Sequence, residues 1–335
     1  MAATAIRWGV LSTAQIGLAQ VIPAMQQAPS CDVVAIASRR LDGAQAAAER
    51  LGLSTAHASY EALLADGRIN AVYNPLPNHL HVPWTIKALE AGKHVLCEKP
   101  IALSAAEAKQ LVDAAALHPE LKVMEAFMYR HHPQWVRARE IVRTGGIGRL
   151  RSIESTFSYF NDDAANVRNQ ADIGGGGLLD IGCYPISVSR WLFEAEPVRV
   201  CATIDRDPRF GTDRHTSALL QFDGGASAFS CSTQAAPYQR VNLLGDAGRV
   251  EVEIPFNPPT DRPTRLRWQH ADGATEAITL ERSNHYAIQG ELFSQAILND
   301  TPVPTPLSDA VANMAVIDAI VRSAENARWE GVTGA

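Results

Sequence analysis

The types and sequence positions of Lys99, Asp180 and Tyr184 indicate proton-transfer chemistry. Lys99 stands in Glu98-Lys99-Pro100, directly after an apolar run typical of a buried strand. Pro100 fixes its own φ and restricts the residue before it, so Lys99 is held on a stiff backbone. The chain has only five lysines among 30 basic residues, and lysine, unlike arginine, has a pKa that responds to burial. On this tripeptide alone, a functional lysine and a solvated Glu–Lys pair are equally good interpretations.

Asp180 and Tyr184 follow four consecutive glycines, 174–177, and are four residues apart. This spacing places both side chains on one face of a helix, and glycines leave room for a ligand against bare backbone. Tyrosine, with a pKa of about 10, is a poor base at neutral pH. A neighbouring ammonium lowers that pKa and makes the phenol useful for acid–base chemistry. Taken alone, such an Asp–Tyr pair is more often a helix-surface pair than a functional one.

A second group of residues has the spacing of a dinucleotide site. The fingerprint GxGxxG places small residues where a strand turns into a helix, so that backbone can approach a pyrophosphate. In this chain the three glycine positions hold Ser12, Ala14 and Gly17. Two departures from glycine leave a plain strand–helix turn as an equally good interpretation of the pattern. Its place as the first such turn of an alternating series favours the nucleotide site.

The end of the second expected strand indicates which nucleotide is bound. An NAD site has Asp or Glu about 20 residues past the glycines, to bind the ribose 2′-hydroxyl. This chain has Ser38-Arg39-Arg40 instead. Guanidinium groups pair with phosphate oxygens, and Arg39 can also stack on a flat ring. The alternative is a solvated arginine pair that binds nothing; with the preceding turn, the pattern predicts NADP rather than NAD.

The elements that must position these residues divide the chain in two. Up to about residue 125, short apolar runs alternate with amphipathic helical stretches, which predicts βαβ units and a parallel sheet. After residues 144–148 the strands alternate apolar and polar residues between glycine-rich turns, which is typical of an antiparallel meander. The sequence therefore predicts an α/β domain over 1–125 and an α+β domain over 147–305. We expect helices 131–144, 286–298 and 308–327 to pack on the first domain.

The expected elements are read from apolar periodicity. In the first domain we expect strands at 6–11, 33–37, 71–73, 94–97 and 123–126, and helices at 14–27, 42–51, 60–64, 80–91 and 105–117. In the second we expect strands at 152–160, 199–204, 217–222, 226–233, 240–244 and 249–252, with helices at 178–193 and 286–298.

Composition excludes several classes of function. The net charge of −6 and pI of about 5.9 argue against a surface for nucleic acid or anionic membrane. Five cysteines without a CxxC pair suggest reduced thiols. The start, MAATAIRWGV, resembles no export leader, and no apolar run is long enough to span a membrane, so we expect a cytoplasmic protein. His79-x-His81 and His131-His132 lack a third ligand at zinc-like spacing, so we expect no metal.

Across nearly its whole length the sequence resembles the glucose–fructose oxidoreductase / inositol dehydrogenase / MocA (Gfo/Idh/MocA) family. The motifs that carry the resemblance are Trp8–Gly17, Asn74–His81, Glu98–Pro100, Met124–Pro133 and Gly175–Tyr184. Many members have Asp…His in the last motif; Asp…Tyr resembles the branch with glucose–fructose oxidoreductase, dimeric dihydrodiol dehydrogenase and aldose dehydrogenases. The resemblance implies a doubly wound Rossmann sheet, then a large, open, mostly antiparallel sheet with helices on one face. That sheet is commonly the subunit interface, so we expect a homodimer or a tetramer.

The resemblance also implies a role for individual residues. Lys99 and Tyr184 would be the proton-transfer pair, Asp180 would orient them, and the Lys99–Pro100 bond would be cis. The pyrophosphate of NADP would be bound by Ser12, Thr13, Ala14, Gln15 and Ile16. The adenosine ribose would be bound by Ser38, Arg39 and Arg40. The middle of the cofactor and its nicotinamide ribose would be bound by Asn74, Pro75, Leu76, Asn78, His81, Glu98 and Lys99. The substrate would face Arg130, Phe160, Asp180 and Tyr184, with Arg168 and Tyr286 added from their fit to a sugar pocket.

The sequence thus predicts an NADP-dependent sugar oxidoreductase that oxidises the C1 hydroxyl of an aldose to a lactone. Asp180 and Arg130 suit a polyol better than an apolar diol. The alternative enzyme is a trans-dihydrodiol dehydrogenase, which a more apolar pocket would favour. A second variant keeps NADP bound and reduces another sugar to an alditol. We expect no proline-rich arm of the kind that clasps NADP in periplasmic glucose–fructose oxidoreductases, and this expectation favours an exchangeable cofactor. A non-catalytic NADP or sugar sensor is the remaining alternative, and the intact Lys99, Asp180 and Tyr184 argue against it.

Overall fold

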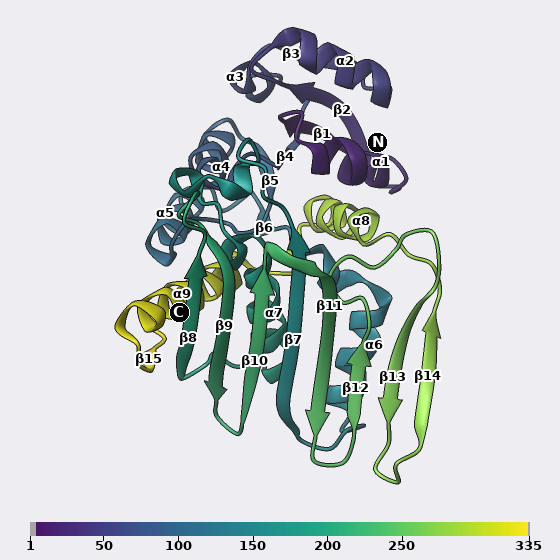
Figure 1. Ribbon diagram of the computed structural model, residues 1–335. Helices are drawn as coiled ribbons and strands as arrows, with labels where there is room; N and C mark the ends of the chain where they lie inside the picture. The colour runs from purple at the N-terminus through teal and green to yellow at the C-terminus, as the bar shows by residue number, and fades with distance from the viewer. Residues whose placement is uncertain (1–4, 334–335) are drawn as a thin grey trace. The chain divides into compact units, whose positions relative to one another are not determined.

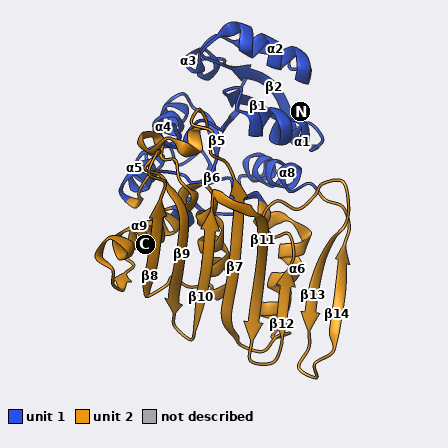
Figure 2. Ribbon diagram, viewed as in Figure 1, with its two compact units in different colours: residues 1–102, 106–128, 284–310 blue, residues 103–105, 129–283, 311–335 orange. Residues whose placement is uncertain are grey.

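The computed structural model describes residues 5–333, which form two compact units (Figures 1 and 2). Unit 1 contains the described residues up to 102, with 106–128 and 284–310. Unit 2 contains residues 103–105 and 129–283 and the described residues from 311 onward. Helix α6 (Pro133–Arg143) and most of α9 (Leu307–Asn326) are part of unit 2. Their packing on the N-terminal domain, which the sequence predicts, stays a prediction.

Unit 1 is built on a six-stranded parallel sheet in the order β3-β2-β1-β4-β5-β6. This is the doubly wound arrangement, in which the strand order reverses between β1 and β4, and it confirms the predicted fold of the N-terminal half. The strands read as nearly continuous apolar runs because helices cover both faces of such a sheet. Their bounds are β1 Ile6–Leu11, β2 Cys31–Ala37, β3 Thr55–His57, β4 Ala71–Asn74, β5 His94–Cys97 and β6 Val123–Glu125.

The helix after β1 differs from the regular α-helix that the sequence predicts over 14–27. It contains a π-helical turn at Gly17–Val21, closed by the Ile22 N–H donating to the Gly17 carbonyl, and it ends at Met25. Apolar periodicity does not distinguish this wider turn from an α-helical one. Besides the first residues of α9, the other α-helices with residues in unit 1 are α2 Leu41–Leu51, α3 Tyr60–Leu64, α4 His81–Glu90, α5 Ala105–Ala115 and α8 His285–Leu298.

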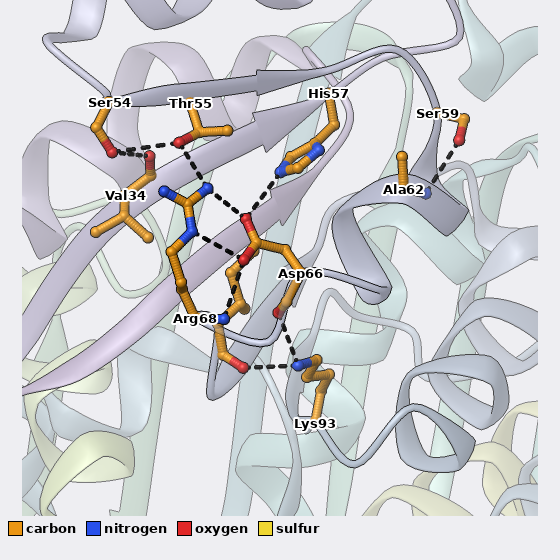
Figure 3. A network of polar contacts seen from close by, with 10 residues as sticks. Val34, Ser54, Thr55, His57, Ser59, Ala62, Asp66, Arg68 and Lys93 are labelled. Carbon is orange, nitrogen blue, oxygen red and sulfur yellow. Dashed lines mark hydrogen bonds and ion pairs between the residues drawn. The ribbon is translucent and has the colours of Figure 1, made fainter.

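A polar network secures the edge of this sheet at β3 (Figure 3). The Arg68 guanidinium donates to the Asp66 carboxylate at 2.6 and 3.0 Å, and these bonds hold the pKa of Asp66 well below its usual range. His57 Nε2 lies 3.3 Å from the same carboxylate. The buried Lys93 ammonium donates to the carbonyls of Asp66 and Ile69 at 3.0 and 2.8 Å. The network therefore ties the loop before β4 both to β3 and to the residue that precedes β5.

Unit 2 is built on a nine-stranded sheet in the order β14-β13-β12-β11-β7-β10-β9-β8-β15. All its neighbouring strands run antiparallel except β7 and β10, since a helix and the β8–β9 hairpin separate these two along the chain. The sequence did not indicate the outer strands β13, β14 and β15. The bounds are β7 Leu150–Phe160, β8 Arg199–Arg206, β9 Asp213–Phe222, β10 Gly225–Ser232, β11 Gln234–Gly245, β12 Arg249–Val252, β13 Thr264–Gln269, β14 Thr275–Leu280 and β15 Glu330–Gly331.

Helices cover one face of this sheet, as predicted: α7 (Cys183–Phe193) contacts the central strand β7, and α6 contacts β12 and β13 (Figure 1). Between them and the sheet lies an aromatic cluster that includes Tyr129, Trp135 and Phe256. The Trp135 indole N–H donates to the Pro255 carbonyl at 2.6 Å, so α6 is anchored to the connection after β12. Over residues 5–333, no helix is long and apolar enough to cross a membrane.

Candidate active site

The predicted nucleotide residues follow four neighbouring strands of unit 1, directly after each strand ends. In the register of the sheet, Leu11 of β1 pairs with Ala37 of β2, and Asn74 of β4 pairs with Cys97 of β5. The carboxyl ends of parallel strands meet at one edge, which is where ligands bind in open α/β sheets. The structure therefore brings the predicted segments to one edge; in spatial order these are 38–40, 12–16, 74–78 and 98–99.

Ser12, at the first glycine position of the fingerprint, has a backbone that glycine normally supplies. Its φ is 107°, a value that strains any residue with a Cβ. The Ser12 N–H donates to the Ala37 carbonyl at 3.0 Å, and its Oγ accepts from the Ala14 N–H at 3.2 Å. The helix begins at Gln15, and the first N–H groups of a helix have no partner within it. This turn fits a bound pyrophosphate.

The end of β2 presents two exposed cations. The Ser38 N–H donates to the His57 carbonyl at 3.2 Å, which fixes the backbone there. Arg40 lies 3.4 Å from the Asp42 carboxylate, with both side chains largely exposed. Burial raises the pKa of Tyr60, and the nearby Arg39 charge opposes that rise. These guanidinium donors fit the 2′-phosphate of NADP. An NAD site would have at this position a carboxylate that binds the ribose 2′-hydroxyl.

The segment after β4 builds a backbone frame rather than an open surface. Asn74 is fully buried, and its amide donates to the His81 carbonyl at 3.1 Å and the Thr85 hydroxyl at 3.2 Å. Leu76 is buried too, and a Cβ on Gly17 would lie 3.8 Å from Pro75 Cγ. Asn78 is half-buried in the turn before α4. Direct contacts of these side chains with a cofactor stay a prediction.

Glu98, Lys99 and Pro100 lie at the end of β5, and the Lys99–Pro100 bond is cis, which confirms the expectation. The Tyr73 hydroxyl donates to Glu98 Oε1 at 2.6 Å. Burial and the Glu98 charge raise the pKa of Tyr73 and also that of Tyr286. The structure thus groups Tyr286, which the sequence analysis assigned to the substrate, with Glu98 in unit 1; its contact with a substrate stays a prediction.

Asp180 is the centre of a polar cluster in unit 2. Its Oδ2 accepts from the Tyr159 hydroxyl at 2.6 Å and from Arg168 Nε at 2.9 Å. The Asp180 side chain is 12% exposed and that of Arg168 is 43% exposed, so the ion pair lies at a surface of the unit. The carboxylate raises the pKa of Arg168, and burial with the same carboxylate raises that of Tyr159. One carboxylate therefore joins β7, the loop after it and the helical turn Leu178–Gly182.

The glycines before Asp180 allow the close packing of the chain around this cluster. We expected them to leave room for a ligand, but two of them do not. A Cβ on Gly175 would lie 2.6 Å from the Arg168 carbonyl oxygen, and one on Gly176, whose φ is 117°, would collide with Asp213 Oδ1. The Gly176 N–H donates to the Arg168 carbonyl at 2.8 Å. Asp213, in turn, accepts from the Leu178 N–H at 2.6 Å. The glycines let the chain pass between Arg168 and Asp213 into the helix.

Tyr184 lies on the same helical stretch as Asp180, as the spacing predicts. The ring is 4% exposed and packs against Phe157, Phe256 and Tyr129 with centroids 5.7, 5.1 and 5.8 Å away. Tyr184 also raises the pKa of Arg168, after the larger effect of Asp180. The predicted residues Asp180, Tyr184 and Arg168 are therefore grouped in unit 2.

The structure does not bring Arg130 and Phe160 to this group in the expected way. The Arg130 guanidinium is buried and donates to the Ser187 hydroxyl at 2.7 and 3.2 Å. Phe160 is 61% exposed, and because side chains alternate along a strand it lies on the opposite face of β7 from Tyr159. Tyr159 was not among the residues predicted from the sequence, although the alternation of Phe157 and Tyr159 along β7 could have indicated it. Substrate contacts of Arg130 and Phe160 stay predictions.

Comparison with protein families matches both halves of the chain. Residues 6–127 match the family described as "Oxidoreductase family, NAD-binding Rossmann fold", and residues 135–251 match the "GFO/IDH/MocA C-terminal domain". Within the described residues, no group of three His, Cys, Asp or Glu is placed to hold a metal ion.

Similar proteins cover nearly the whole chain. An uncharacterized oxidoreductase, ORF334, of Rhizobium meliloti is 45% identical over 98% of this chain and 99% of its own length. D-xylose 1-dehydrogenase (NADP(+)) 2 of Haloferax volcanii is 39% identical, over 95% and 97%. Among solved structures, KijD10, a 3-ketoreductase from Actinomadura kijaniata in complex with NADP and TDP-benzene, has a TM-score of 0.89 at 32% identity, over 95% and 98%.

Proposed function

The chain belongs to the Gfo/Idh/MocA family of oxidoreductases, and we propose that it is an NADP-dependent enzyme that oxidises the C1 hydroxyl of aldoses to aldonolactones. The observation that carries the sugar assignment is the cluster in which Tyr159 and Arg168 bind Asp180. Asp180 lies on the helical stretch that leads to Tyr184. Small-molecule sites use a few placed polar groups to fix orientation. An ionic cluster beside the tyrosine suits a polyol better than an apolar diol.

The proposed cofactor is NADP. The strained turn at Ser12 and the guanidinium groups of Arg39 and Arg40 have the donors that a pyrophosphate and a 2′-phosphate need. Both the 39% identical xylose dehydrogenase and the 3-ketoreductase structure carry NADP in their names. These observations support NADP over NAD.

In the proposed reaction each residue has one task. Tyr184 takes the proton of the C1 hydroxyl as general base. The Lys99 ammonium favours the phenolate form of that tyrosine. Asp180, held by Tyr159 and Arg168, accepts hydrogen bonds from the sugar hydroxyls and orients the ring. When bound, NADP supplies the carbon that accepts the C1 hydride, and the sugar leaves as a lactone.

A second candidate is reduction of a keto group on a nucleotide-linked sugar, suggested by the 3-ketoreductase structure and by a 34% identical relative, the dTDP-3,4-didehydro-2,6-dideoxy-alpha-D-glucose 3-reductase of Actinomadura kijaniata. The similarity to the 3-ketoreductase structure is high, with a TM-score of 0.89. The same residues serve that reaction in reverse, since Tyr184 would then donate the proton. The xylose dehydrogenase has the higher identity, 39%, and favours the oxidation of a free aldose.

A substrate screen separates the candidates. The purified protein is offered aldopentoses and aldohexoses with NADP or NAD, and absorbance in the reduced-nicotinamide band is followed. We expect lactone formation with NADP, led by D-xylose or a related aldose. Turnover of a dTDP-linked keto sugar or a trans-dihydrodiol, with none of any aldose, would replace the proposal by the corresponding alternative. Tight binding of NADP or sugar with no turnover of any substrate would establish the non-catalytic sensor.

Retention of NADP between turnovers is a separate hypothesis. An arginine pair with a helix N-terminus could hold NADP at nanomolar strength, roughly −12 kcal/mol, and such affinity implies slow release. The test is to purify the protein without nucleotide, measure bound NADP and add an aldose alone. Lactone and alditol in equal amounts would establish an enzyme that passes hydride between sugars. A protein that needs stoichiometric NADP would rule it out, and this is the outcome we expect.

We also propose that two copies associate through the open face of the nine-stranded sheet. This face has a depression of about 550 Å³ along strands β7 to β11, and it exposes Leu219, Tyr238 and Trp329. Exposed apolar patches of this kind are typical of interfaces. Light scattering on the eluting protein should give a dimer or tetramer, and Leu219→Arg should give monomers. A monomeric wild type would contradict the proposal.

A further inference from the structure

His81 is a buried histidine whose two ring nitrogens both face backbone carbonyls. It is the first residue of α4, with a relative exposure of 1%. Nδ1 lies 2.7 Å from the carbonyl oxygen of Pro100, and Nε2 lies 2.7 Å from that of Leu76. The ring thus bridges the turn after β5 and the loop after β4, two segments of the predicted cofactor edge.

The two contacts require two protons on the ring. A neutral imidazole has one N–H donor and one acceptor nitrogen, whereas a carbonyl oxygen can only accept. A neutral His81 would therefore set one nitrogen lone pair against a carbonyl lone pair at 2.7 Å, which is repulsive. The imidazolium donates to both oxygens, and 2.7 Å is at the short end of the range typical of charge-assisted bonds.

Several groups oppose the charge. Burial lowers the pKa of His81, and the charges of Lys99 and His79 act in the same direction, while the Pro100 and Leu76 carbonyls raise it. Burial and the two charges favour a neutral ring, so the imidazolium rests on the two short contacts. The positive end of the α4 dipole also disfavours a cation there. The balance depends on whether both short contacts are kept. Since a neutral ring cannot keep both, the observed bridge favours the protonated ring, and loss of that proton would open one side of the bridge.

The bridge closes a frame around the backbone of Lys99. On one side of Lys99, the Glu98 N–H donates to the Asn74 carbonyl at 3.0 Å. On the other side, Pro100 is held through its carbonyl by His81. Asn74 is itself bonded to the His81 carbonyl. Both chain neighbours of Lys99 are therefore fixed to the segment 74–81.

We propose that His81 is a positioning residue for Lys99, and that as an imidazolium it ties the Pro100 carbonyl to the Leu76 carbonyl and so fixes the backbone that carries the lysine. The part that concerns Lys99 rests on the proposed function. The protonation state and the rigidity of the turn do not, so the test includes readouts that need no substrate.

The first readout is the nitrogen spectrum of the ring. Protein labelled with ¹⁵N-histidine is studied at pH 7 by long-range ¹⁵N–¹H correlation, and the His81 signals are identified by their loss in His81→Gln. Two protonated, pyrrole-type nitrogens are expected. A single pyrrole-type nitrogen beside a pyridine-type one would overturn the assigned charge.

The second readout is the rigidity and activity of three variants. His81→Phe keeps a ring without donors, His81→Gln keeps N–H donors, and His79→Gln is the matched control two residues away. Hydrogen exchange in the peptide covering residues 96–102 should be faster in His81→Phe than in the wild type and the control. In the folded His81→Phe enzyme, kcat should fall roughly 10- to 100-fold, as for the loss of charge-assisted hydrogen bonds, with KM for the sugar little changed. His81→Gln should recover part of this loss.

The outcomes separate the inference from the proposed function. Unchanged exchange at residues 96–102 in folded His81→Phe would overturn the positioning role, whatever the substrate is. Faster exchange with unchanged kcat per folded protein would show a purely structural bridge and overturn the link to Lys99. An enzyme inactive on all aldoses, with the two-proton spectrum and the faster exchange both observed, would contradict the proposed function and leave the bridge established.

Discussion

Two carboxylates of this protein each accept a tyrosine hydroxyl at 2.6 Å, and they are positioned in different ways. In unit 1, Tyr73 of β4 donates to Glu98, which follows the neighbouring strand β5. In unit 2, Tyr159 of β7 donates to Asp180, which lies in a helical turn 21 residues further along the chain. The first pair follows from the register of a parallel sheet. The second depends on a loop that also places Arg168 on the same carboxylate.

The difference indicates a division of labour between the units. A pair fixed by strand register belongs to a rigid edge, which suits the binding of a large, invariant cofactor. Loops in general vary more between related proteins than the elements they connect, so a carboxylate held partly by a loop side chain suits the choice of substrate. Changes in unit 1 should therefore act mainly on NADP binding, and changes around Asp180 mainly on the sugar.

The largest effect is expected at the proton-transfer residues, one in each unit. Tyr184→Phe and Lys99→Ala should each reduce kcat by roughly 10²–10⁴, the usual range for general acid–base groups. NADP affinity of Tyr184→Phe, measured by fluorescence titration, should be close to that of the wild type. If the two residues act together in one proton transfer, the double variant is scarcely slower than either single variant. Full activity of Tyr184→Phe would refute its role.

Loss of either tyrosine hydroxyl tests the comparison directly. Tyr159→Phe removes a bond to a charged acceptor, worth about 1.5–3 kcal/mol, so kcat/KM for the sugar should fall roughly 10- to 100-fold with NADP affinity unchanged. Tyr73→Phe removes the matching bond to Glu98 and should instead weaken NADP. Steady-state kinetics and nucleotide titration of both variants give the result. Equal effects of both on the sugar would contradict the division between the units.

The arginine pair should decide the choice of nucleotide. Replacing Arg39 or Arg40 by Gln should weaken NADP by about 1–3 kcal/mol for each lost charge-assisted contact, with little change for NAD. Calorimetric titration of both nucleotides measures the difference, and Arg68→Gln, at the structural network of the same unit, is the control. Equal affinity of the wild type for NAD and NADP would refute the assignment.

Asp213 should make stability depend on pH. Burial raises the pKa of this carboxyl to about 6 in the folded state, above the unfolded value of about 3.9. Between pH 4 and 6 the folded protein therefore binds more protons than the unfolded chain, and stability falls as pH rises through that window. Asp213→Asn should flatten the decline, by up to roughly 3 kcal/mol. Urea unfolding at several pH values checks this, with the exposed Asp223→Asn as control; an unchanged profile in Asp213→Asn would contradict it.

The smallest effect is expected at Ser12. Its φ of 107° strains a residue that has a Cβ, so Ser12→Gly should relieve roughly 1 kcal/mol of strain, part of which is offset by the greater freedom of glycine in the unfolded chain. Thermal unfolding should show a Tm equal to or slightly above that of the wild type, and NADP affinity should be kept. A clear loss of stability would show that the Ser12 hydroxyl, through its bond to Ala14, matters more than the strain.

The residues at the carboxyl ends of the unit 1 strands could be predicted from the sequence because each strand and its turn are indicated by neighbouring residues along the chain. Apolar runs and turn residues indicated β1, β2, β4 and β5, and the residues after them follow at one edge of any parallel sheet. The short strand β3 was missed because three residues show no periodicity. The outer strand β13 alternates buried Thr264 and Leu266 with exposed Arg265 and Arg267, a pattern that could have indicated it. Strand β14 was missed because it has no buried residue.

The Asp180 cluster could be predicted only in part. The spacing of Asp180 and Tyr184 indicated a shared helix, which the structure confirms. The bond from Tyr159 depends on which face of β7 meets the helix, and that is a tertiary contact rather than a pattern along the chain. The close approach of Arg168 and Asp213 to Gly175 and Gly176 is likewise a tertiary contact that no pattern along the chain indicates.

The transfer of the C1 hydrogen tests the central claim most directly. An aldose that the screen finds active is labelled with deuterium at C1 and incubated with the protein and NADP, and the reduced nucleotide is analysed by mass spectrometry. We predict one deuterium in each NADPH formed, at the nicotinamide ring, and a lactone without deuterium at C1. NADPH without deuterium, or deuterium retained in the sugar product, would contradict oxidation at C1.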